Sequence, residues 1–92
     1  MRVKLASGKA CGALALGVSS RKIGDMAVER PHFIASVDTM AEGGMVPAAG
    51  GVIVAGDEGT ILGAIGVTGD TSDNDEACAL AAIEALGLKA LP

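Results

Sequence analysis

Aromatic side chains are almost absent from this sequence of 92 residues, in which Phe33 stands alone and tryptophan and tyrosine do not occur. Half of the residues are nonetheless hydrophobic. A chain of this length forms one domain with a modest core, so that core must be built from aliphatic side chains and methionine. Met26, Met40 and Met45 are therefore expected to fill the core rather than to contact a ligand.

Clustered positive charge and long apolar runs are also missing. The formal net charge is −4, and the basic residues are scattered along the chain: Arg2, Lys4, Lys9, Arg21, Lys22, Arg30 and Lys89. This distribution argues against nucleic-acid binding, which needs a clustered basic surface. No run is long enough to span a membrane, and no convincing signal-peptide cleavage site follows Ala10–Val18, so we expect a cytoplasmic protein without a membrane partner.

Cysteine and histidine are scarce. Cys11 and Cys78 lie in alanine-rich, helix-like contexts, and we expect free, buried thiols because cytosolic disulfides are rare. Together with the single histidine, His32, they do not supply the four ligands of a zinc site, so no metal site is expected. His32 is chemically able to ligate haem iron, but its place after Pro31 at a helix start also suits an exposed surface residue.

Glycine, in contrast, is abundant: its 14 copies are about twice the usual share and indicate turns and close backbone contacts. Periodicity and capping residues predict helices over 3–16, 21–29 and 31–42, strands over 52–55 and 60–68, and a last helix over 72–86. The last helix is apolar almost all round beyond Ala77, so we expect it to be mostly buried. The tail from Ala90 to Pro92 is expected to fray.

The stretch from Gly50 to Glu76 predicts a β-hairpin that leads into a helix. Its turn is Gly56-Asp57-Glu58-Gly59, which separates two β-rich runs. One face of the second run carries small side chains, among them Ala64 and Gly66. Such a face leaves room for a helix, a second backbone or a ligand. A sheet of two or three strands also leaves two edges that need pairing or protection.

Several segments together form a pattern that extends along nearly the whole chain: Lys9-Ala10, Pro31 with Phe33, Gly43 to Pro47, Gly50 to Val52, Gly63 to Gly69, and Asp75 to Ala79. This pattern resembles the GlcG/HbpS-like family, also called the haem-degrading-domain family. The resemblance implies an α+β fold, in which a profilin-like antiparallel sheet is flanked by helices on both faces. Residues 1–92 would form a single, partial domain of this family.

The resemblance also implies a difference in length. Family domains carry another helix and a strand pair before the Lys-Ala helix, and this sequence has neither, so the domain is expected to be N-terminally shortened. Unpaired sheet edges would then be covered by another chain. We therefore expect a homo-oligomer, or a partner chain that supplies the missing strands.

A ligand site is expected where the glycine-rich segments meet the first helix. The resemblance places Lys9 near the glycine-rich strands, where it could hold a carboxylate or a haem propionate; a solvated helix lysine is the alternative. Gly50, Gly51, Gly66 and Thr68 could offer backbone N–H groups to an anion, and turn geometry with tight helix–sheet packing is the competing interpretation. The acidic cluster of Asp70, Asp73, Asp75 and Glu76 is interpreted as helix capping rather than as a magnesium or calcium site.

The resulting hypothesis is a non-catalytic, oligomeric protein that binds a small molecule. The resemblance implies haem, another tetrapyrrole or a small anionic metabolite as the ligand. The alternative is an enzyme or accessory subunit in small organic acid catabolism of the glycolate or diol type, with Lys9 and backbone donors polarising a carboxylate or carbonyl. The sequence assigns no catalytic residue, because His32 has no identifiable partner.

Overall fold

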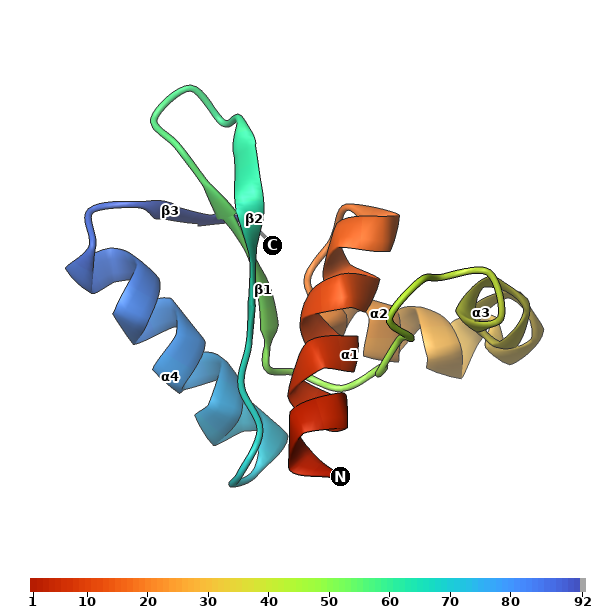
Figure 1. Ribbon diagram of the computed structural model, residues 1–92. Helices are drawn as coiled ribbons and strands as arrows, with labels where there is room; N and C mark the ends of the chain where they lie inside the picture. The colour runs from red at the N-terminus through yellow and green to blue at the C-terminus, as the bar shows by residue number, and fades with distance from the viewer. Residues whose placement is uncertain (92) are drawn as a thin grey trace.

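The computed structural model describes residues 1–91, which form four helices around a three-stranded sheet (Figure 1). In chain order the elements are α1 (Arg2–Leu16), α2 (Ser20–Glu29), α3 (Pro31–Asp38), β1 (Gly51–Ala55), β2 (Ile61–Gly66), α4 (Ser72–Ala85) and β3 (Lys89–Leu91). The α+β class is confirmed. None of the helices in this part of the chain is long and apolar enough to cross a bilayer.

The helix ends follow the capping residues. α1 stops at Gly17, whose φ of 72° lies in the left-handed region that glycine tolerates. The Ser19 hydroxyl accepts a hydrogen bond from the backbone N–H of Lys22 and caps α2. α3 begins with Pro31 at its first position but ends at Asp38, four residues before the predicted end at position 42.

The sheet is antiparallel, with strand order β2-β1-β3. β1 and β2 form the predicted hairpin, closed by hydrogen bonds from the N–H of Gly56 to Thr60 and from the N–H of Gly59 to Gly56. The register shifts between Val54 and Ala55, next to the hairpin turn. At the other end of the hairpin β1 begins at Gly51, which pairs with Gly66, so β2 is shorter than predicted and Thr68 lies beyond its end.

The prediction of a fraying tail was wrong for the residues that the structure describes. Lys89, Ala90 and Leu91 form β3, which pairs antiparallel with β1. Gly87 ends the preceding helix in the left-handed conformation, with a φ of 73°, and turns the chain back onto the sheet. Pro92, the last residue of the predicted tail, lies outside the described residues.

The two faces of the sheet are covered by different helices, as expected. α4 packs on one face, where the buried core consists of Val52, Val54, Ala79 and Ile83. α1 packs on the other face, and Figure 1 shows the two helices on opposite sides of the strands. A second cluster of Ile23, Ile34 and Met45 holds α2 and α3 to the loop that precedes β1.

Three burial predictions were wrong. α4 buries only one narrow stripe because a thin sheet covers a single side of the helix, and both Leu80 and the residue that follows the helix, Leu86, are exposed. Both cysteines are free as predicted, but Cys11 is only half-buried and Cys78 is exposed. Met45 does fill the core, whereas Met40 is exposed because α3 has already ended.

Candidate functional site

Lys9 is a buried residue in the middle of α1, only 3% exposed. Its Nζ donates a hydrogen bond to the carbonyl of Val67 at 2.9 Å and pairs with Oδ2 of Asp75 at 3.2 Å. Burying an ammonium group without a partner is costly, so these contacts are what make its position tolerable. Lys9 is therefore not the solvated helix lysine of the alternative interpretation, and its charge is already neutralised within the chain.

Asp75, the partner of Lys9, is itself held by the backbone of the loop before α4. Its second oxygen, Oδ1, accepts a hydrogen bond from the backbone N–H of Asp70 at 3.0 Å. Asp75 lies in the first turn of α4, where a carboxylate also interacts favourably with the helix dipole. The side chain of Thr71 caps the same helix by accepting a hydrogen bond from the N–H of Asn74. The Lys9–Asp75 pair thus ties α1 to the connection between β2 and α4.

Two of the predicted glycines, Gly50 and Gly51, lie against Lys9, and Gly66 lies against Ala6 of the same helix, but protein atoms fill the space that these glycines leave. A methyl group added to Gly50 would lie 2.8 Å from the Lys9 Nζ. One added to Gly51 would overlap the backbone carbonyl of Lys9, and one on Gly66 would overlap that of Ala6. These glycines let α1 lie directly against the sheet. That Lys9, Gly50, Gly51, Gly66 and Thr68 also bind a ligand stays a prediction.

The remaining sequence candidates lie apart from this cluster. His32 is exposed near the start of α3. Among the described residues, no group of three or more His, Cys, Asp or Glu side chains is placed to hold a metal ion. The role of His32 as a haem ligand stays a prediction.

Two members of the acidic cluster hold a different cation. Arg21 of α2 pairs with Asp73 and with Glu76, to which its Nε donates at 2.9 Å. The hydrogen bond with Asp73, followed by the hydrogen bond and charge of Glu76, raises the pKa of the Arg21 guanidinium above its ordinary value. The sequence predicted capping for this cluster, and the interhelical partners Lys9 and Arg21 could not be found from spacing alone.

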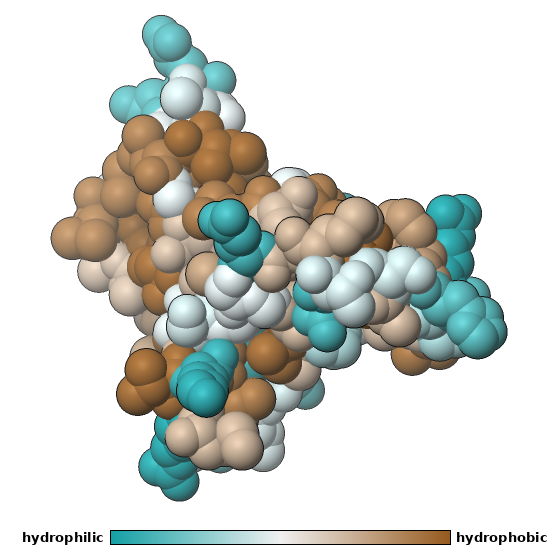
Figure 2. Space-filling model, turned by 45° about the vertical axis from the view of Figure 1, so that its right-hand side comes forward, coloured by the Kyte–Doolittle hydropathy of each residue, from teal (hydrophilic) through white to brown (hydrophobic). Residues whose placement is uncertain are grey.

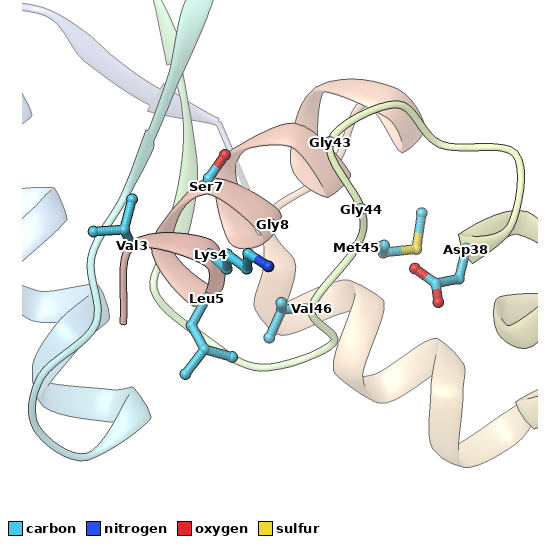
Figure 3. Close-up of a pocket in the computed structure, with 10 residues that line it drawn as sticks. All are labelled: Val3, Lys4, Leu5, Ser7, Gly8, Asp38, Gly43, Gly44, Met45 and Val46. Atoms are coloured by element: carbon cyan, nitrogen blue, oxygen red, sulfur yellow. The ribbon is translucent and has the colours of Figure 1, made fainter. Parts of the chain in front are cut away.

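An open groove of about 560 Å³ lies on the other side of α1, between that helix and the segment Gly43–Val46 (Figure 3). Two glycines of α1 bring the segment close: a methyl group on Gly8 would lie 2.7 Å from Val46, and one on Gly12 would lie 2.9 Å from Met45. The wall on the helix side is formed by the first turns of α1. This groove has the size of a typical small-molecule pocket.

The groove is mostly apolar with two charged side chains. Val3, Leu5 and Val46 supply apolar surface, and Figure 3 shows Lys4 extending from α1 toward the Gly43–Val46 segment. Asp38, at the end of α3, also lines the groove. Lys4 is exposed, so its ammonium group can meet an anion without first losing its hydration.

The sequence did not predict this groove. Its residues come from the first turns of α1, the end of α3 and the loop after it, and none of them belongs to a motif with recognised chemistry. The segment Gly43-Gly44-Met45-Val46 contributes to the family resemblance, but its residue types do not indicate that it lines a groove.

Comparisons with known proteins give two matches. The family model described as "Haem degrading protein HbpS-like" matches residues 1–84. A solved structure, the crystal structure of a PduOC–haem complex, superposes with a TM-score of 0.80 at 24% sequence identity, over 98% of this chain and 64% of that chain. This chain therefore spans just under two thirds of that neighbour's length. No curated protein sequence matches significantly.

Proposed function

Since this chain belongs to the HbpS-like family of haem-degrading proteins, we propose that it binds haem or a related tetrapyrrole in the groove between α1 and the Gly43–Val46 segment. The observation that carries the proposal is the groove itself, which combines a volume of about 560 Å³ and an apolar lining with one exposed cation. The haem in the complex with the similarly folded PduOC adds support.

The groove suits a flat amphiphilic ligand better than the glycine cluster does. Around Lys9 the space is occupied by the backbone of α1, and the ammonium group is already paired with Asp75. In the groove, Val3 and Leu5 offer apolar contact, and Lys4 offers a positive charge. Ligand pockets in proteins usually have this composition, a mostly apolar lining with few polar groups.

The test is to fill the groove and measure haem binding. Ser7 is exposed and lines the groove from α1, so Ser7→Trp places a bulky ring in the space that the ligand needs. Ser36→Trp is the matched control, because Ser36 is an exposed serine of α3 that does not line the groove. Hemin is titrated into each protein, and the shift of the Soret band is followed to saturation.

We expect saturable binding to the unchanged protein and to Ser36→Trp, and a loss of affinity of about tenfold or more for Ser7→Trp. Hemin binding that is not saturable in the unchanged protein would exclude the proposed function. Equal binding by both variants would show that haem does not bind in this groove.

We also propose that the protein works as an oligomer or with a partner chain. β2 and β3 are the edges of the sheet, and Ile61 and Leu62 on β2 are 49% and 60% exposed. Figure 2 shows hydrophobic side chains over a broad area below the hydrophilic tip at the top of the view. Exposed apolar edge strands usually pair with another chain. Native mass measurement distinguishes the cases, and a monomer without a partner would contradict this proposal. The cytoplasmic location stays a prediction.

A further inference from the structure

The groove contains few atoms that can coordinate iron. Haem iron in proteins is usually held by His, Cys, Met or Tyr side chains. Among the described residues that line the groove, Met45 is the one side chain of these types. It is 8% exposed and packs in the cluster with Ile23 and Ile34, and its Cγ lies against Gly12. Its thioether is therefore engaged in the core.

The charged groups of the groove are placed for a ligand's carboxylates instead. Lys4 and Asp38 both line the groove, and among the described residues neither forms a salt bridge. Lys4 extends from α1 toward the Gly43–Val46 segment (Figure 3). An anionic group beside Lys4 would gain attraction, and one beside Asp38 would be repelled. The groove is thus polar at two places of opposite sign, with apolar surface between them.

We infer that the groove selects its ligand by the carboxylates and the flat apolar ring of a tetrapyrrole, and not by the metal. Lys4 is the specificity-determining residue: it pairs with a ligand carboxylate, while Asp38 disfavours the reversed orientation. This inference rests on the proposed function, because it describes how the same groove would recognise its ligand. It implies that metal-free porphyrin carboxylates bind about as well as haem.

Three probes separate the contributions of iron and carboxylate: hemin, metal-free protoporphyrin IX, and hemin dimethyl ester, in which both carboxylates are esterified. Each is titrated into the unchanged protein, Lys4→Ala, and Arg2→Ala. Arg2→Ala is the matched control, since Arg2 is an exposed cation of the same helix that does not line the groove. His32→Ala serves as a second control for iron coordination outside the groove.

We expect protoporphyrin IX and hemin to bind the unchanged protein within about threefold of each other. An exposed ion pair contributes modestly, so Lys4→Ala should weaken both by about two- to fivefold and leave the ester unaffected. Raising the salt concentration should shrink that difference. Arg2→Ala and His32→Ala should leave all three affinities unchanged.

Two results would overturn the inference while leaving the proposed function intact. One is hemin that binds more than about tenfold tighter than protoporphyrin IX, which would assign recognition to iron coordination. Loss of this advantage in His32→Ala would identify His32 as the iron ligand. The other is a Lys4→Ala substitution that weakens hemin and its dimethyl ester by the same factor, which would make Lys4 a packing residue. If hemin does not bind the unchanged protein at all, the proposed function itself fails.

Discussion

Replacing Lys9 by methionine tests whether the buried ion pair holds α1 on the sheet. The side chains of Lys9 and Asp75 are each 4% exposed, so Lys9→Met leaves the Asp75 carboxylate buried without its cation. Breaking a buried pair in this way typically costs about 3–5 kcal/mol. Asp75 keeps its hydrogen bond from the N–H of Asp70, so we expect a value near the lower limit, about 3 kcal/mol.

The second variant removes the carboxylate charge in place of the ammonium charge. Asp75→Asn keeps an oxygen that can accept from the N–H of Asp70 but leaves Lys9 buried and charged, so it should also destabilise the protein. In the double variant Lys9→Met with Asp75→Asn neither charge remains buried. We expect it to be more stable than Lys9→Met alone, with a coupling energy of about 1–3 kcal/mol.

Thermal and urea unfolding, followed by circular dichroism, measure these differences. For a domain of this size, about 3 kcal/mol lowers the melting temperature by at least about 12 °C. A loss below about 1 kcal/mol for Lys9→Met, or two single changes that add without coupling, would show that the buried pair does not hold α1 on the sheet. If Lys9→Met does not fold, comparison of Asp75→Asn with the double variant still decides the question.

Two further predictions concern the packing of the helices. Gly66→Ala places a methyl group against the backbone carbonyl of Ala6, which cannot move without displacing α1. We therefore expect the free energy of unfolding to fall by about 2–3 kcal/mol. Gly63 lies on the same strand with open space around it, so Gly63→Ala should change the free energy of unfolding by less than about 1 kcal/mol in the same assay. Similar losses for both would contradict the close packing of α1 on β2. Arg21→Ala should lower the melting temperature slightly at low salt and hardly at all at high salt, because the Arg21 side chain is 47% exposed and its ion pairs are screened. Since the pKa of Arg21 is raised from an already high value, its contribution is present below that pKa and is lost only in strongly alkaline solution, so this difference should not vary with the guanidinium's ionisation near neutral pH.

Much of the fold could be predicted because it depends on local signals. Ser19 caps α2 and Thr71 caps α4 from the positions directly before these helices, and Gly17 ends α1. The hairpin turn between Gly56 and Gly59 is encoded by its own residues. The small-residue face of β2 left a choice between a helix, a second backbone and a ligand, and the backbone of α1 at Ala6 takes the space beside Gly66.

The parts that failed depend on contacts between distant residues. β3 has only three residues and no alternating pattern, and it exists because β1 offers an unpaired edge where α4 returns the chain. The partner of Lys9 is 66 positions away in sequence, so its burial could not be foreseen from the composition of its helix. The groove depends on where α1 meets the Gly43–Val46 segment, which no local pattern specifies.

α1 has a different role on each of two sides, since one side packs against the sheet and the other lines the groove. Lys9 engages the sheet and Asp75, while its immediate neighbour Gly8 forms part of the groove wall, about 100° further round the helix. A helix with its side chains has a radius of about 5–6 Å, so a rotation of roughly 20° would carry the groove-lining side chains about 2 Å sideways. The shape of the groove therefore depends on the buried Lys9–Asp75 pair, because a substitution at this pair that rotates α1 also moves the side chains that line the groove.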